Sequence, residues 1–118
     1  MNLICLKENL ELGIQAASYI SKEHESLPVL KHALIETADG KIVLTATNLE
    51  TGIRYFLSGK AIEAGSLTFP VQPLFQIVHN LQYDRVTLAS KDNTLEISTE
   101  NYHAKFQGGP KEDFPIFP

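Results

Sequence analysis

The stretch VLKHALIETADGKIVLTAT, residues 29–47, decides the fold of this chain. Residues 29–39 and 41–47 each alternate apolar with polar side chains, and Asp39-Gly40 lies between them. An Asp-Gly pair readily adopts the positive φ angles that a two-residue hairpin turn requires. The stretch therefore predicts two antiparallel strands joined by a tight turn.

The residues before this hairpin predict a strand and then a helix. Residues 2–7 place apolar side chains on both faces, as in a strand that is buried on both sides. The stripe of residues 8–21 has helical spacing and consists of Leu10, Ile14, Ala17 and Ser21, widened by Leu12, Ala16 and Tyr19. Glu8 and Glu11 lie in the first turn, where the helix dipole favours negative charge.

The residues after the hairpin repeat this order of elements. A third strand at 51–58 and a connector at 59–65 are followed by a strand at 66–70 and a helix at 71–81 with Pro73 in its first turn. Residues 85–90 and 94–99 predict another hairpin, and residues 102–107 predict a last strand. The three prolines of residues 108–118 and the lack of periodicity indicate a connector.

The chain thus reads as a duplicated β-α-β-β-β unit. Such a duplication predicts an α+β fold in which two helices pack on two antiparallel sheets, each small sheet being covered by one helix. A length of 118 residues with 43% hydrophobic and 20% charged residues fits a single domain that spans residues 1–118.

The chemistry-bearing residues do not form the patterns of an enzyme or a metal protein. Cys5 is the one cysteine, which excludes an internal disulfide and a cysteine-based zinc site, and its apolar neighbours predict a buried thiol. The four histidines lack metal-ligand spacing, and the sequence has neither a phosphate loop nor a nucleophile elbow. We therefore expect no catalytic residue, metal or cofactor.

Two surfaces remain as candidates for function. Residues 72–80 contain no formally charged residue, and polar side chains there can hydrogen-bond to phosphate or water. A helix of low charge is equally suited to packing against another subunit. Residues 102–107 alternate apolar with polar side chains and predict an edge strand that could pair with another chain, although Lys105 could also guard that edge.

Several segments resemble the bacterial sliding clamp family, the beta subunit of DNA polymerase III, in its first domain. The matching segments share the family's order and spacing and are LPVL at 27–30, ADG at 38–40, LTATNLE at 44–50, FP at 69–70 and EDFP at 112–115. Together they span the whole chain, and the duplicated β-α-β-β-β unit is also the DNA-clamp plan of that family.

The resemblance implies a DNA polymerase processivity factor for DNA replication that has no catalysis of its own. In the family, three such domains form a subunit, and two subunits join head to tail as a homodimer ring around double-stranded DNA. The helices line the hole, and the sheets form the outer wall. Weak, mobile phosphate contacts suit sliding. The alternative is a protein–protein interaction domain of clamp-like fold that does not encircle DNA, which the net charge of −4 supports.

Site residues follow from the same matching. The implied DNA-binding residues are His24, Gln72, Lys22, Lys7 and His79. His24 and Gln72 stand where the family often has a basic residue, so this chain departs from the pattern there. The implied contacts with the third domain of the neighbouring clamp subunit are Pro73, Leu74, Ala104 and Phe106.

The length also departs from the family. The chain ends just after Asp113-Phe114-Pro115, so we expect an N-terminal fragment of a three-domain subunit. The replicative DNA polymerase and the clamp loader would then bind through C-terminal domains outside this chain. The lack of a long apolar run predicts no membrane segment, and the single cysteine and the absence of a leader pattern predict a cytoplasmic protein.

Overall fold

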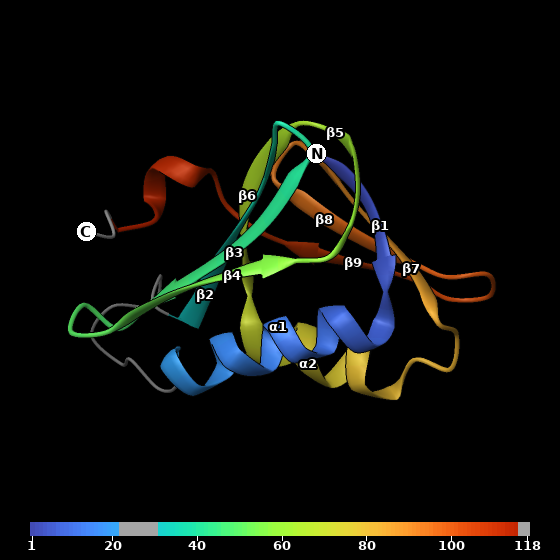
Figure 1. Ribbon diagram of the computed structural model, residues 1–118, viewed down its shortest axis with the longest axis horizontal. Coiled ribbons are helices and arrows are strands. Elements are labelled where there is room, and N and C mark those ends of the chain that lie inside the picture. The colour runs from blue at the N-terminus through green and yellow to red at the C-terminus, as the bar shows by residue number, and fades with distance from the viewer. Residues whose placement is uncertain (22–30, 116–118) are drawn as a thin grey trace.

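The computed structural model describes residues 1–21 and 31–115. Its helices are α1 (Lys7–Ile20), α2 (Val71–Asn80) and the short 3-10 helix η2 (Lys111–Asp113). Its strands are β1 (Asn2–Leu6), β2 (His32–Ala38), β3 (Lys41–Thr47), β4 (Gly52–Leu57), β5 (Gly59–Glu63), β6 (Gly65–Pro70), β7 (Arg85–Lys91), β8 (Thr94–Ser98) and β9 (His103–Gln107). The predicted α+β fold of two helices on two antiparallel sheets is confirmed (Figure 1).

The hairpin predicted around Asp39-Gly40 forms as expected. Strands β2 and β3 pair antiparallel up to Ala38 opposite Lys41, which leaves Asp39 and Gly40 as the turn. Their φ angles are 53° and 77°, both in the left-handed region. The second hairpin, between β7 and β8, turns in the same way at Asp92 and Asn93. Both tight turns therefore follow from residue types that tolerate positive φ.

The two sheets do not coincide with the two repeated units. One sheet has the order β5-β1-β7-β8-β9 and the other β4-β3-β2-β6. Strand β1 of the first unit therefore pairs with β7 of the second, and β6 of the second unit pairs with β2 of the first. This exchange places strands of both halves in each sheet, and side chains from both halves share one continuous core.

The predicted connector at 59–65 is wrong, because residues 59–63 form strand β5. It pairs antiparallel with β1 at one edge of the five-stranded sheet. Most of its side chains are exposed, including Ile62 at 50%. An exposed edge strand lacks the apolar alternation by which a half-buried strand is recognised, so residues 59–63 carry no hydrophobic signal for a strand.

The burial of side chains in β1 and α1 differs from two of the expectations. Strand β1 is buried on one face through Leu3 and Cys5, whereas Leu6 is 46% exposed, so it is not buried on both faces. Helix α1 buries the predicted positions Leu10, Ile14 and Ala17, and Ser21, just beyond its end, is also buried. The residues expected to widen its apolar stripe do not all do so, since Leu12 is 55% and Tyr19 66% exposed.

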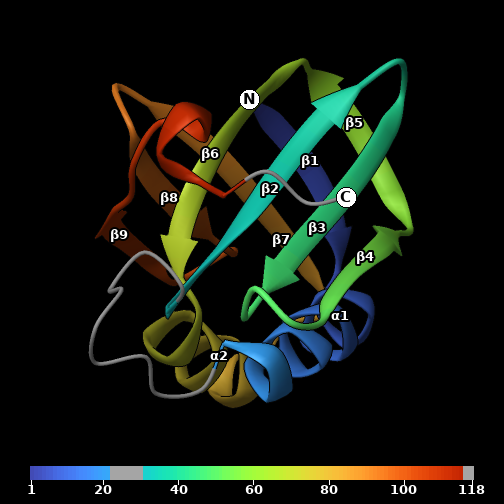
Figure 2. The same ribbon diagram turned by 90° about the vertical axis from the view of Figure 1, so that its left-hand side faces the viewer.

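The end of the described chain is more ordered than a connector. Gly109 bridges to Thr68 of β6, and η2 follows. The Lys111 ammonium donates to Glu36 Oε2 at 2.8 Å, and Phe114 is buried. Residues 108–115 thus lie against the four-stranded sheet (Figure 2). Within the described ranges, neither α1 nor α2 has both the length and the apolar character needed to span a bilayer.

Candidate nucleic-acid interface

The two long helices form one face of the molecule. Helices α1 and α2 pack side by side below the sheets in Figures 1 and 2. Helix α1 also packs on β3 and β4, which fixes its orientation against the sheet. The exposed residues of this helical face are Glu8, Leu12, Gln15 and Tyr19 from α1, and Gln72, Pro73, Gln76, His79 and Asn80 from α2.

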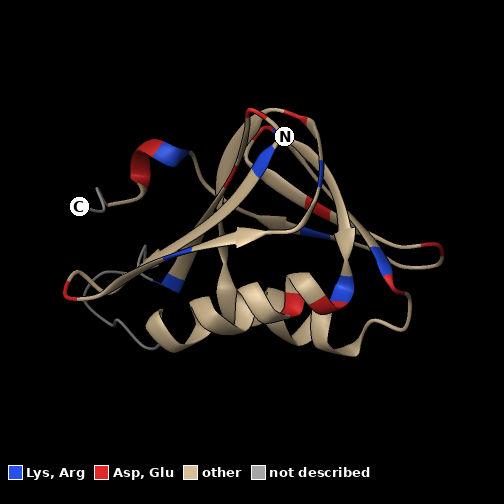
Figure 3. Ribbon diagram, in the orientation of Figure 1, with Lys and Arg blue, Asp and Glu red and all other residues tan. Residues whose placement is uncertain are grey.

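The helical face carries little charge, and that charge is not positive. Helix α1 contains Lys7, Glu8 and Glu11, whereas α2 contains no lysine, arginine or carboxylate (Figure 3). One positive and two negative residues give the helices a formal charge of −1. Such a surface attracts a polyanion weakly, because long-range phosphate binding depends on clustered lysine and arginine.

Lys7 is used inside the domain. Its ammonium donates to the carbonyl oxygens of His79 at 3.2 Å and Leu81 at 2.5 Å, at the C-terminal end of α2. Its backbone N–H also donates to the carbonyl of Asp84 at 2.7 Å. A cation at this position satisfies open carbonyls and complements the negative end of the helix dipole.

His79 has a partner on the other helix. Its Nδ1 lies 2.5 Å from Glu11 Oε2, and 66% of its side chain remains exposed. When the ring is protonated, this contact is an ion pair between α1 and α2. His79 and Glu11 thus join the two helices across the face, next to the bonds of Lys7.

Of the other predicted DNA-contact residues, Gln72 is described by the structure, and Lys22 and His24 are not. Gln72 lies in the first turn of α2 with its side chain exposed on the helical face. Lys22 and His24 lie outside the described residues. Of the described ones, only Gln72 is exposed and has none of the internal contacts that engage Lys7 and His79.

The predicted subunit-contact residues divide in a similar way. Strand β9 is an edge strand: within the described sheet it pairs with β8 on one side alone. Ala104 and Phe106 are half-buried on it, and Pro73 is exposed on α2. Leu74, by contrast, is 1% exposed and belongs to the core, so its side chain is not available to another subunit in this conformation.

Two side chains of the described residues, Cys5 and His32, have shifted pKa values because they are buried or half-buried. Cys5 is buried, and this burial raises the pKa of its thiol to about 12. His32 is half-buried beside Thr68, and burial lowers its pKa. No three of the His, Cys, Asp and Glu side chains within residues 1–21 and 31–115 come together as metal ligands would.

Sequence reasoning missed the internal roles of Lys7, Glu11 and His79. These partners stand 68 to 74 residues apart in the chain. No local sequence pattern predicts a contact between residues so far apart in the chain. Lys7 was expected at a DNA surface because it is basic, but the fold aims it at the end of α2.

The chain is similar to known proteins over its whole length. The model of the family described as DNA polymerase III beta subunit, N-terminal domain, matches residues 1–118. The beta sliding clamp of Chlamydia muridarum is 31% identical over 111 residues, which cover 92% of this chain and 30% of that protein. The beta sliding clamp of Synechocystis is 28% identical, and the match covers 100% of this chain and 32% of that protein. The chain therefore spans about a third of the length of these relatives.

Solved structures agree with the sequence comparisons. A DNA polymerase III beta subunit from Eubacterium rectale superposes with a TM-score of 0.94 at 28% identity, covering 100% of this chain and 32% of that one. The Helicobacter pylori beta clamp bound to a DNA ligase peptide shows the same fold, with a TM-score of 0.93 at 20% identity over 100% of this chain and 33% of that one. Together with the matched family model, these likenesses show that the chain belongs to the DNA polymerase III beta subunit family, as its N-terminal domain.

Proposed function

We propose that this domain is one sector of a ring-shaped sliding clamp, which encircles duplex DNA and tethers the replicative polymerase without chemistry of its own. The observation that carries this proposal is the position of α1 and α2, which lie side by side as one face beneath two curved sheets. A ring built from such sectors would present helices to DNA and sheets to solvent.

The charge of the helical face favours a protein that stays on DNA by encircling it over one that stays by tight ionic binding. A protein that held DNA through many ionic contacts would need a basic surface, and a clamp that slides would be slowed by such contacts. The two helices have a formal charge of −1, and Lys7 and His79 already have hydrogen-bond partners within the domain. A closed ring stays on DNA because it encircles the duplex, so neither Lys7 nor His79 has to bind phosphate tightly.

The complete subunit would hold three domains, with this one first, and two subunits would close the ring head to tail. Polymerase and clamp loader would bind through the other domains, and the Helicobacter pylori beta clamp bound to a DNA ligase peptide is an example of a clamp with a peptide ligand. The site of action would be the cytoplasm, where bacterial DNA is replicated.

We infer that β9 and the first turn of α2 contact the neighbouring subunit. Strand β9 offers an unpaired edge within the described sheet, with Ala104 and Phe106 half-buried along it. Pro73 is exposed at the start of α2. A strand from the neighbour could extend the five-stranded sheet by backbone hydrogen bonds at this edge.

We also infer that Gln72, Lys22 and His24 make the mobile DNA contacts of this sector. Replacing His24 by arginine adds a permanent positive charge at a position where the family often has arginine. We expect His24→Arg to prolong the retention of the complete subunit on circular DNA at low salt. Unchanged retention at low salt would mean that residue 24 makes no contact with the duplex.

The proposal is tested by the salt dependence of DNA binding. The complete subunit would be loaded on closed circular DNA and on linear DNA of the same sequence, and bound protein would be measured from low to moderate salt. Enclosure predicts retention on the circle that resists salt and little retention on the linear form. Binding through phosphates alone would fall by about a thousandfold or more between 50 and 200 mM salt on both forms. That result would favour a domain that does not encircle DNA.

A further inference from the structure

Apolar side chains gather on the outward face of the five-stranded sheet, at the end near β5. Leu3 and Cys5 of β1 point into the core, so Ile4 and Leu6, which alternate with them, lie on the outward face. Ile4 is half-buried, and Leu6 is 46% exposed. Ile62 on the adjacent edge strand β5 is 50% exposed. Three apolar side chains of neighbouring strands thus remain in contact with solvent.

Two cations flank these apolar side chains. Lys60 of β5 stands directly opposite Ile4, and Arg85 of β7 stands directly opposite Leu6. Side chains of directly opposite residues project from the same face of a sheet. Lys60 and Arg85 are both exposed, and they lie two strands and two residues apart, which places their Cα atoms about 12 Å apart. We call Ile4, Leu6, Lys60, Ile62 and Arg85 the outer patch.

The cations of the outer patch have no acidic partner in the domain. Among the described residues, neither Lys60 nor Arg85 forms an ion pair, although Asp84 precedes Arg85 in the chain. Both carboxylates in the strands of this sheet, Glu63 and Glu96, are paired within the domain. The outer patch is therefore positive in a chain whose net charge is −4, and it favours a ligand that carries carboxylates.

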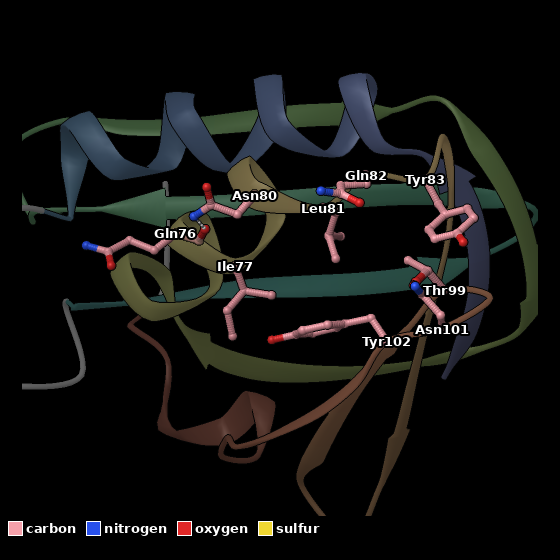
Figure 4. Close-up of a pocket in the computed structure, with 9 residues that line it drawn as sticks. All are labelled: Gln76, Ile77, Asn80, Leu81, Gln82, Tyr83, Thr99, Asn101 and Tyr102. Carbon is pink, nitrogen blue, oxygen red and sulfur yellow. Dashed lines mark hydrogen bonds between the residues drawn. The ribbon is translucent and has the colours of Figure 1, made fainter.

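A groove gives the outer patch depth. It has a volume of about 320 Å³, lies where β1 ends and α1 begins, and is lined by Ile4, Cys5, Leu6, Asn9, Ser58, Gly59 and Arg85. Apolar side chains thus share this groove with one cation. The cavity at the C-terminal end of α2, drawn in Figure 4, differs because its described lining residues are all uncharged. The groove at β1 can therefore take an apolar side chain whose neighbour is a carboxylate.

We propose that the outer patch binds an acidic peptide segment of another protein. An apolar side chain of the segment fills the groove, and carboxylates on either side of it pair with Lys60 and Arg85. An extended segment with carboxylates four residues apart spans about 13 Å, which matches the separation of the two cations. Nucleic acid fits less well, because two cations around an apolar centre neutralise few phosphates. This inference goes beyond the proposed function and requires only that the outward face of the sheet is accessible in the subunit.

The test measures the binding of a defined peptide to the complete subunit. The probe is fluorescently labelled Glu-Thr-Leu-Thr-Glu with blocked ends, and its binding is followed by fluorescence anisotropy. One control peptide, Lys-Thr-Leu-Thr-Lys, reverses the charge, and another, Glu-Thr-Ser-Thr-Glu, lacks the apolar side chain. The probe should bind more tightly than either control, and its affinity should fall as salt is added, because the ion pairs are exposed.

Variants of the subunit assign this binding to the outer patch. Lys60→Glu and Arg85→Glu should each raise the dissociation constant of the probe about fivefold or more, because each replaces an attraction by a repulsion. Lys41→Glu, at an exposed position of β3 in the other sheet, is the matched control and should leave it unchanged. Leu6→Ser should also weaken binding, whereas Leu49→Ser, at a comparably exposed leucine outside the patch, should not.

Every other outcome would overturn the inference. If the probe binds no better than the charge-reversed peptide, the outer patch does not select acidic segments. If the probe binds but the patch variants bind it equally well, its site lies elsewhere on the subunit. If a labelled linear DNA duplex, and not the probe, loses affinity in Lys60→Glu and Arg85→Glu, the patch serves nucleic acid. If sedimentation shows a self-association that Leu6→Ser abolishes, the occupant is a second copy of the chain. Retention on circular DNA, measured with the same proteins, tests the proposed clamp function separately.

Discussion

At the scale of single residues, we expect Cys5 to lower the stability of the domain as the pH rises above 9. Burial raises the pKa of the thiol from 9.0 to about 12 in the folded domain. Below pH 9 the thiol is protonated in both states, so it contributes no pH dependence. Between pH 9 and 12 the unfolded chain loses this proton and the folded domain keeps it. The free energy of unfolding should therefore fall as pH rises, by at most ~1.4 kcal/mol per pH unit from this group.

Urea unfolding of the domain at several pH values between 8 and 11 checks this expectation. The informative quantity is the difference between this protein and Cys5→Ala, which lacks the thiol. The variant should be less stable at pH 8 because a buried side chain is shortened, yet its stability should decline less steeply. Equal slopes for the two proteins would show that Cys5 does not ionise on unfolding in this range.

At the scale of elements, Lys7 fastens the start of α1 to the end of α2. Lys7→Met keeps the length of the side chain and removes the ammonium that donates to His79 O and Leu81 O. Since the site is partly exposed, we expect a loss of about 1 kcal/mol in the free energy of unfolding. Lys60→Met on the exposed strand β5 is the control and should change stability little. An equal effect of the two substitutions would mean that the bonds of Lys7 add no net stability.

The seam between α1 and the four-stranded sheet depends on Gly13. A Cβ at this position would lie 2.8 Å from Leu44 Cδ1 and 3.0 Å from Tyr55 Cδ1. Leucine there would overpack the seam, and we expect Gly13→Leu to cost about 1–3 kcal/mol despite the better helix propensity of leucine. Thermal unfolding should show this loss, whereas Gln15→Leu on the exposed side should stay near the stability of the parent. A stable Gly13→Leu domain would contradict the close packing.

The elements that could be predicted from sequence are those with strong local signals. Asp39-Gly40 predicts a turn, and the spacing of Leu10, Ile14 and Ala17 predicts the buried side of α1. Both patterns are local, because each lies within a few residues of the chain. Strand β5 could not be found in this way, since its partner β1 lies far away in the chain and its side chains face solvent.

The candidate site was harder to predict for the same reason. Gln72 is exposed on the helical face, but Leu74 is in the core and Lys7 bonds to the end of α2. The Lys7 contact joins residues 74 positions apart in the chain, so no local pattern predicts it. Residue type alone does not tell whether a lysine faces a ligand or a helix end.

At the scale of the whole molecule, the geometry and the charge support one explanation together. The two long helices form a continuous face, which suits the inner wall of a ring. Their formal charge of −1 would make a poor open binding surface for DNA. A mildly acidic inner face becomes workable when closure of the ring, and not ionic attraction, keeps the protein on the duplex.

The most direct test is to cut the DNA. The complete subunit would be loaded on a closed circle at moderate salt, a restriction endonuclease would cut the circle once, and gel filtration would measure the protein that stays with the DNA. Enclosure predicts that the protein remains on the intact circle and leaves the cut molecule by sliding off its ends. Equal retention on cut and intact DNA would contradict the account, because it would show that contacts and not closure hold the protein.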